Sequence, residues 1–284
     1  MRKLAHIVNP VIVKPTSDLY VAQPVTFETM KTARDFARGT VDVAMYSAQF
    51  PEDHAIVPPG LEITSDLERS ILDFGTFPRP WKLPVMGDIL ERLYAAAPDA
   101  EYLVYTNVDI ALMPNFYVSI DRIIDEGCDA FVINRRTITE KYQHIKEIPL
   151  MYAEAGQMHE GHDLFVFRRD VFPKFKMGRI CLGVPWVGRV LIWNLLCNAR
   201  RFQEFRHLHL TFHIGNDAIG LRPENVAFQN HNKAEARKVM EALQAEHGTQ
   251  FLTAYPLEMT LRLTPWVRMR RLAREMLGRL PGPG

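Results

Sequence analysis

The stretch Tyr102-Leu-Val-Tyr-Thr-Asn-Val-Asp109-Ile110 decides the fold. It begins with residues that are typical of a buried strand, and the polar residues Asn107 and Asp109 follow at once. In open α/β sheets, ligands bind beyond the carboxyl ends of the strands. The stretch therefore predicts a central strand of an α/β sheet, with two polar side chains at the edge where ligands bind.

The segments before this strand alternate between strands and helices. Residues 4–9 form a first apolar run that ends at Pro10, and residues 41–46 form a second. Between them, Thr26 is the expected N-cap of a helix over residues 27–38. This β-α-β order indicates parallel strands joined by a crossover helix. We further expect a long loop over residues 50–84, with a short helix near 66–73, and a helix over 85–97.

The second half continues the alternation but becomes less regular. We expect helices over residues 114–126, 170–175, 185–197 and 233–246, and strands over 130–134, 163–168 and 207–213. No linker rich in Gly, Ser or Pro divides the chain, so we expect one domain over residues 1–255. Residues 256–284 are expected to form a C-terminal helical extension.

Composition excludes several classes of protein. The chain has 284 residues, of which 47% are hydrophobic, and can bury a core without disulfides. Its net charge of +1 gives no sign of a nucleic-acid partner. Its three cysteines show no paired spacing, and no segment reads as a signal peptide or a membrane span. We therefore expect a cytoplasmic protein, and an oligomer stays open.

The C-terminal extension combines cationic and apolar residues at helical spacing over residues 266–280. The cationic residues are Arg268, Arg270, Arg271, Arg274 and Arg279. Such a helix predicts either peripheral contact with the inner face of a membrane or docking on the protein's own core or a partner subunit.

Asp109 is a candidate metal ligand, and His213 ends the later run over residues 207–213. A carboxylate at the end of a strand can bind Mg²⁺ or Mn²⁺ on a diphosphate, and Asn107 can supply a neutral oxygen or bind a ribose. If residues 207–213 form one strand, alternation places His207, His209 and His213 on one face. The alternatives are a turn or helix cap at Asn107 and Asp109, and a histidine that is merely hydrogen-bonded at position 213.

The order of elements resembles that of glycosyltransferases with the GT-A fold, over residues 4–217. The residues that carry the resemblance are Asn9-Pro10, Lys82-Leu-Pro84, Met86-Gly-Asp88 and Asn107-Val-Asp109, with Asn107 in place of the first Asp of the family's Asp-x-Asp motif. The resemblance implies a GT-A-like (Rossmann-like) α/β fold: a mixed, mostly parallel sheet flanked by helices. It also implies transfer of a sugar from a nucleotide-sugar donor to a glycan, a lipid-linked or another hydroxyl acceptor. Asp109 and His213 would hold the Mn²⁺ or Mg²⁺.

The resemblance also implies roles for side chains that bind the donor. Asn9, Lys82 and Asp88 would bind the nucleoside and the phosphates, and Arg135 would neutralise the diphosphate. The alternative for each single charge is a solvated surface group, or at Asp88 a favourable interaction with the helix dipole.

The position of the catalytic base departs from the family's pattern. Similar enzymes carry a carboxylate shortly after an aromatic residue that corresponds to Trp186, but residues 187–189 contain none. Asp163 or Asp217 must then deprotonate the acceptor, or the mechanism is retaining, or the activity is altered. Trp186 is expected to stack on a sugar ring, and a core aromatic is the alternative.

Two other functions stay open. A sugar-phosphate nucleotidyltransferase would need a Gly-rich basic loop after the first strand, and residues 9–14 contain no Gly. A catalytically degenerate protein that binds carbohydrate or nucleotide would explain both Asn107 and the missing carboxylate after Trp186. The absence of Gly-x-x-x-x-Gly-Lys and Gly-x-Ser-x-Gly motifs argues against phosphate-loop kinases and α/β-hydrolases.

Overall fold

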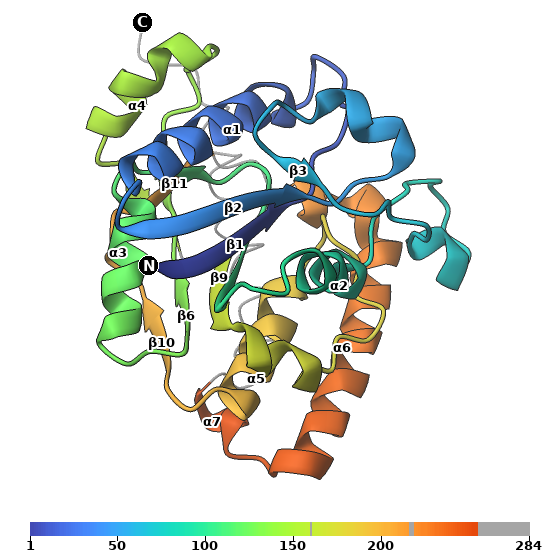
Figure 1. Ribbon diagram of the computed structural model, residues 1–284. Coiled ribbons are helices and arrows are strands. Elements are labelled where there is room, and N and C mark those ends of the chain that lie inside the picture. The colour runs from blue at the N-terminus through green and yellow to red at the C-terminus, as the bar shows by residue number, and fades with distance from the viewer. Residues whose placement is uncertain (160, 216–218, 255–284) are drawn as a thin grey trace, which may run out of the picture.

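The computed structural model describes residues 1–159, 161–215 and 219–254, and a seven-stranded sheet lies at its centre (Figure 1). The strand order is β10-β6-β9-β4-β1-β2-β3. In chain order these strands are β1 (Arg2–Val8), β2 (Val41–Ser47), β3 (Glu62–Ile63), β4 (Tyr102–Thr106), β6 (Ala130–Ile133), β9 (Leu164–Arg168) and β10 (Phe202–Phe205).

All strands of this sheet except β9 run in the same direction. Strand β9 is antiparallel to both of its neighbours, and its first residue, Leu164, pairs with Thr106 at the end of β4. The prediction of a mixed, mostly parallel sheet is confirmed. Because β9 is reversed, the residues before it lie at the same edge as the carboxyl ends of β4 and β6.

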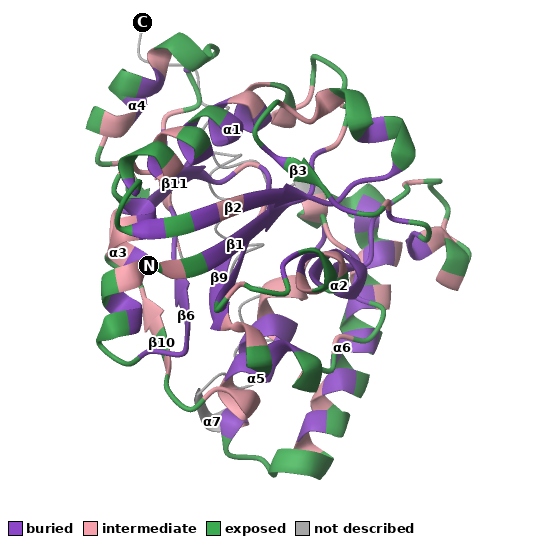
Figure 2. Ribbon diagram, viewed as in Figure 1, coloured by how far each residue is buried: buried purple, intermediate pink, exposed green. Residues whose placement is uncertain are grey.

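Helices cover both faces of the sheet (Figures 1 and 2). Helices α1 (Leu19–Phe36) and α3 (Phe116–Asp125) pack on one face, and α2 (Met86–Ala96) and α5 (Val187–Asn198) on the other. Successive residues of β4 alternate between these layers, as the period of a strand requires: Val104 joins the first core and Leu103 the second. Each fully buried side chain of this size contributes about 1.5–3 kcal/mol to folding.

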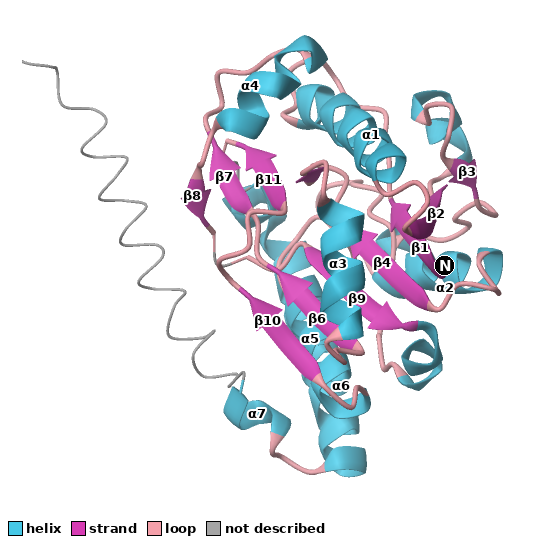
Figure 3. Cartoon of the chain, turned by 60° about the vertical axis from the view of Figure 1, so that its left-hand side comes forward, coloured by secondary structure: helices cyan, strands magenta, loops and turns pink. Residues whose placement is uncertain are grey.

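A smaller sheet of order β5-β11-β7-β8 lies beside the central one (Figure 3). It consists of β5 (Ala111–Leu112), β7 (Arg136–Ile138), β8 (Gln157–Met158) and β11 (Thr211–Ile214). Helix α4 (Ile148–Ala153) follows β7 and precedes β8 in the chain. Helix α6 (Val226–His247) packs against α5, and α7 (Phe251–Ala254) follows it. Short 3₁₀ helices occupy Pro51–Ile56, Ile71–Phe74, Ile145–Glu147, Arg169–Lys174, Ile219–Leu221 and Pro223–Asn225.

The first helix begins earlier than the sequence predicted. Asp18, and not Thr26, is its N-cap, and the Asp18 carboxylate accepts a hydrogen bond from the Leu19 N–H at 2.9 Å. Thr26 is fully buried inside the helix. Pro24 explains the error, because proline removes a helical donor and usually marks a boundary. Here it lies within the helix.

Other boundaries also differ from the prediction. Residues 207–213 do not form one strand, since β10 ends at Phe205 and β11 begins at Thr211, so the shared face proposed for the three histidines is wrong. The short helices expected near 66–73 and over 170–175 are the 3₁₀ helices Ile71–Phe74 and Arg169–Lys174. The basic helix expected over 266–280, like Asp217, lies outside the described residues. Within the ranges that the structure describes, no helix is long and apolar enough to cross a membrane.

Candidate functional site

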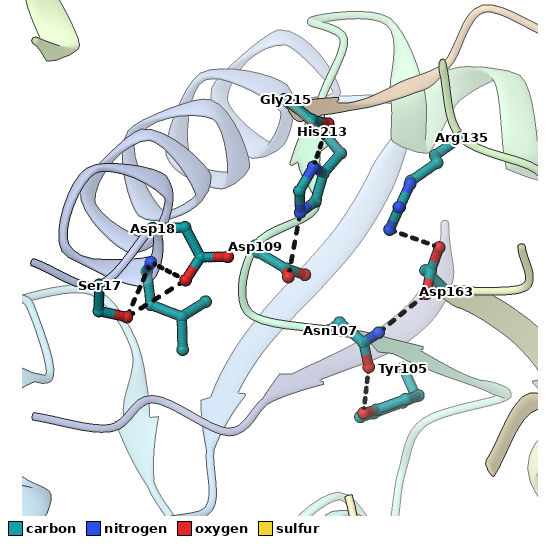
Figure 4. Close-up of polar contacts among 10 residues, drawn as sticks. Ser17, Asp18, Tyr105, Asn107, Asp109, Arg135, Asp163, His213 and Gly215 are labelled. Carbon is teal, nitrogen blue, oxygen red and sulfur yellow. Dashed lines mark hydrogen bonds and ion pairs between the residues drawn. The ribbon is translucent and has the colours of Figure 1, made fainter. Parts of the chain in front are cut away.

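A cavity of about 470 Å³ opens at the carboxyl edge of the central sheet. Polar side chains from distant parts of the chain meet there (Figure 4). They are Asn107 and Asp109 after β4, Arg135 after β6, His159 after β8, Asp163 before β9 and His213 in β11. The cavity therefore lies where an α/β sheet of this kind binds ligands.

A hollow of about 610 Å³ lies at the opposite edge of the sheet. It is larger, but its charged side chains already have partners within the protein. The Arg2 guanidinium is paired with Asp121, and that of Arg168 with Asp170. The Arg169 guanidinium donates hydrogen bonds to the backbone carbonyls of Tyr94 and Ala97. The charges of this hollow are thus used within the protein, and the cavity at the carboxyl edge is the better candidate site.

Asp109 and His213 form a pair at the base of the cavity. Nδ1–H of His213 donates to the Gly215 carbonyl at 2.9 Å, and Nε2 lies 3.2 Å from Oδ2 of Asp109 (Figure 4). Oδ1 of Asp109 is buried and has no hydrogen-bond partner among the described residues. The bond to Gly215 fixes the orientation of the ring, so that Nε2 faces Oδ2 of Asp109.

The charges of the pair stabilise each other. Burial favours neutral forms, yet the hydrogen bond and charge of Asp109 outweigh it and raise the pKa of His213. Burial likewise raises the pKa of Asp109, but the hydrogen bond and charge of His213 dominate and the net shift is downward. Asp109 is therefore a carboxylate at neutral pH.

The pair fits a divalent cation held jointly with a ligand once that cation displaces the proton from Nε2, because only a neutral imidazole coordinates a metal. Cation–oxygen distances near 2.1 Å place neighbouring donors of an octahedral site about 3 Å apart. The 3.2 Å between Oδ2 and Nε2 agrees with that spacing, and the unpartnered Oδ1 offers a further donor. No group of three or more His, Cys, Asp or Glu side chains within residues 1–159, 161–215 and 219–254 could hold a metal on its own. Phosphate oxygens and water would have to complete the coordination.

Asp163 holds a chain of hydrogen bonds along one wall of the cavity. Its Oδ1 accepts from the Asn107 amide at 2.9 Å, and its Oδ2 accepts from Nη1 of Arg135 at 2.9 Å. The Tyr105 hydroxyl donates to Oδ1 of Asn107 at 2.7 Å. Burial, with the charges of Asp109 and Asp163, raises the pKa of Tyr105 well above its usual value, so this hydroxyl stays protonated.

This chain gives Asp163 a second role. Each of its carboxylate oxygens accepts one hydrogen bond and keeps a further lone pair, so the role of general base stays a prediction. The arrangement also fixes the Asn107 amide and the Arg135 guanidinium. Nε of Arg135 is buried without a hydrogen-bond partner in the described part of the chain, and Arg135 lines the cavity.

Trp186 lines the apolar side of the cavity in an unusual backbone conformation. Its φ of 92° is the only positive value among the described non-glycine residues. A bulky residue in the left-handed region is strained, and such strain concentrates at functional sites. Trp81 and Val184 extend the same wall. Trp186 thus lines the cavity, and its stacking on a sugar ring stays a prediction.

Three predicted donor-binding residues do not line the cavity. Lys82 pairs with Glu52 on the surface, and the Arg69 guanidinium forms a two-pronged ion pair with buried Asp88. The Asn9 amide donates to the Ala48 carbonyl. The charges of Lys82 and Asp88 are thus satisfied locally, by partners that sequence spacing did not reveal.

Some lining residues were missed by the sequence analysis. Asp18 lines the cavity at the start of α1, and the Ser17-Asp18 pair before an apolar run is an N-cap signal that could have revealed it. Tyr105 lies in the strand quoted at the outset. His159 and His162 also line the cavity, and no sequence pattern distinguishes them from solvated residues.

Comparison with known proteins supports the fold. The sequence matches no protein-family model and no curated protein. The structure of S. aureus TarS is similar, with a TM-score of 0.51 and 12% sequence identity, over 89% of this chain and 42% of TarS. This chain has a GT-A-like fold.

Two further structures show a weaker likeness. One is S. aureus TarS 1–349 in complex with UDP-GlcNAc, with a TM-score of 0.49 and 10% identity, over 91% of this chain and 77% of that one. The other is a Drosophila galactosyltransferase complex with manganese, UDP-Gal and xylobiose, with a TM-score of 0.40 and 12% identity, over 76% of this chain and 72% of that one.

Proposed function

We propose that the protein is a glycosyltransferase that uses a nucleotide-sugar donor. The Asp109–His213 pair carries the proposal, because it places an unpartnered carboxylate oxygen beside an oriented imidazole at the ligand-binding edge of a GT-A-like sheet. This donor set fits Mn²⁺ or Mg²⁺ in contact with a diphosphate. When bound, the cation would stabilise the negative charge of the departing nucleoside diphosphate.

The other polar side chains of the cavity would bind different parts of the donor. Arg135 lies in the same cavity as the pair and would bind a diphosphate oxygen through its unpartnered Nε. Asn107 would keep the position that Asp163 and Tyr105 give it.

The nucleoside would bind at the carboxyl ends of β1 and β2. The Gln49 side chain is fully buried there with neither amide atom hydrogen-bonded to a described residue, and the same holds for the Ser47 hydroxyl. Buried polar groups are normally satisfied, so a buried water would occupy these atoms in the free protein. Neither residue lines the cavity, so contact with a nucleoside requires the segments that cover them to open. Asn9 ends β1 in the same region, but its amide is already used by Ala48.

The acceptor would bind against Trp186 on the other side of the cavity. Its half-buried indole offers a flat apolar surface of the kind on which sugar rings stack. A glycan, a lipid-linked sugar or another hydroxyl compound would fit this wall. We expect the reaction in the cytoplasm, and the basic extension after residue 255 would bring the enzyme to lipid-linked acceptors at the inner face of a membrane.

Calorimetry with UDP, GDP and CDP, with and without Mn²⁺, tests the proposal. We expect Mn²⁺ to strengthen binding of one nucleotide at least 10-fold in the wild type, and Asp109→Asn or His213→Gln to abolish that gain. Asp99→Asn and His207→Gln are the matched controls, since both side chains are exposed and outside the cavity. Equal metal-dependent binding by all five proteins would show that the site is assigned wrongly.

The second candidate is a protein that binds a nucleotide or a carbohydrate without transfer. The lack of a carboxylate at residues 187–189 favours it. Nucleotide binding without hydrolysis or transfer of UDP-sugars, across a panel of glycan and lipid-linked acceptors, would support this candidate over an active enzyme.

A further inference from the structure

His159 lines the cavity and is held in place by defined contacts, but it has no role in the function proposed above. Its backbone N–H donates to the Arg135 carbonyl at 3.1 Å, which ties the end of β8 to the segment after β6. Its imidazole lines the same cavity as Asp109, His213 and Asp163.

The Gly161 backbone determines which ring nitrogen of His159 carries the proton. The Gly161 N–H donates to Nδ1 of His159 at 2.8 Å. Nδ1 must therefore be the unprotonated nitrogen, and Nε2 carries the hydrogen. Protonation of Nδ1 would set one N–H against another and break the bond to Gly161.

Gly161 is needed for this arrangement. A Cβ atom at that position would lie 2.6 Å from Cε1 and 2.7 Å from Nδ1 of His159. Such distances are far below van der Waals contact, so any other residue would displace the ring. The sequence thus provides both the donor that fixes the tautomer and the space that the ring needs.

The surroundings keep the imidazole neutral. Burial lowers the pKa of His159 to about 4, and the positive charge of Arg135 acts in the same direction. Asp163 opposes this shift, while His213 and His162 add to it. No residue that the structure describes accepts a hydrogen bond from Nε2 of His159. The group is therefore a neutral donor at physiological pH, and it is unsuited to be a base.

We propose that His159 binds the donor substrate, by donating a hydrogen bond from Nε2–H to an oxygen of the nucleotide sugar. The proposal rests on the function proposed above. Two oxygens of that ligand would suit the donor: an anionic oxygen of the diphosphate, or a hydroxyl of the sugar. A hydrogen bond to a charged oxygen is the stronger of the two, so the size of the effect separates them.

Two substitutions test the proposal by calorimetry in the presence of Mn²⁺, with UDP and UDP-GlcNAc or with GDP and GDP-mannose as probes. His159→Phe keeps the ring shape but removes the donor, whereas His159→Gln retains an amide donor. For a sugar hydroxyl, we expect His159→Phe to weaken only the nucleotide sugar, by about 2- to 12-fold. For a diphosphate oxygen, we expect it to weaken both probes, by about 12- to 150-fold. His159→Gln should bind within about 3-fold of the wild type, as should the surface control His207→Phe.

Several results would overturn the proposal. Wild-type affinity in His159→Phe would show that the donor is unused, and equal loss in His159→Phe and His159→Gln would show that only ring shape matters. If the wild type binds no nucleotide, both this proposal and the proposed function fail; if it binds and His159→Phe binds equally well, only this one fails. Nitrogen NMR of the imidazoles, with His159→Gln to assign the signal, gives a second readout. An imidazolium or an Nδ1–H tautomer at neutral pH would contradict the proposed donor.

Discussion

Replacing Asp163 with asparagine separates two roles for this carboxylate. As a general base, Asp163 would matter for turnover and little for folding. As the anchor of Asn107 and Arg135, it should matter for the stability of the folded protein. Its two oxygens each accept a hydrogen bond at 2.9 Å, and the Arg135 side chain that it neutralises is only 10% exposed.

The expected magnitude follows from these contacts. Asparagine has one acceptor oxygen, so either Asn107 or Arg135 loses its partner in Asp163→Asn. The guanidinium also loses the negative charge beside it while it stays buried. A hydrogen bond to a charged group contributes about 1.5–3 kcal/mol, and a buried ion pair that loses one partner costs about 3–5 kcal/mol. We therefore expect the free energy of unfolding to fall by about 2–4 kcal/mol.

Urea denaturation of four proteins measures this effect: the wild type, Asp163→Asn, Arg135→Met and the double variant. Because the two side chains are paired, the double variant should lose at least about 1 kcal/mol less than the sum of the single losses. Asp170→Asn is the control, since its pair with Arg168 lies on the surface and should contribute about 0–1 kcal/mol. An Asp163→Asn protein as stable as the wild type, with kcat reduced at least 100-fold, would refute the anchor role and support the role of general base.

Three further predictions concern pH, backbone strain and packing. Burial holds the pKa of His6 at about 3, against 6.5 in the unfolded chain. Between these two pH values only the unfolded state binds the extra proton, so the free energy of unfolding should fall by about 1.4 kcal/mol for each pH unit as the pH drops. Urea denaturation at several pH values should show a smaller dependence on pH in His6→Gln. Trp186→Gly should be more stable than Trp186→Ala by about 1 kcal/mol, because only glycine adopts the left-handed conformation without strain, and the opposite order in urea would contradict the strain. Gly161→Ala should displace His159 and weaken nucleotide-sugar binding as much as His159→Phe does, and unchanged affinity would show that this position tolerates a Cβ atom.

The sequence was most informative where one physical requirement dominates. The apolar runs that became β1 and β4 are buried over most or all of their length, as their composition predicts for central strands, whereas β2 keeps an exposed Asp42. Helix boundaries were less certain, because Pro24 lies within a helix whose tertiary packing tolerates it. The direction of β9 could not be predicted, since the pattern of a buried strand is the same in both directions.

The candidate site was predictable in part for the same reason. Asn107 and Asp109 follow a strand directly, so their place at the edge of the sheet depends on one element only. Lys82 and Asp88 are paired with Glu52 and Arg69, which lie well before them in the chain, and spacing along the sequence does not predict these pairs. The place of His159 depends on the Gly161 N–H and on a backbone bond to the segment after β6. Periodicity along the sequence does not reveal such contacts.

The reversal of β9 has a consequence for the evolution and engineering of substrate choice. Strands β6 and β9 are neighbours in the sheet, so the excursion from residue 134 to 163 leaves and re-enters the fold at adjacent points. It carries Arg135, His159 and Asp163 into the cavity, whereas Asp109 and His213 come from outside it. Strand β7 of the excursion pairs with β11, the strand that carries His213, so β7 must be kept if the candidate metal pair is to stay in place. The part of the excursion after β7 can be lengthened, shortened or grafted from a homologue, and chimeras exchanged there offer a route to altered selectivity.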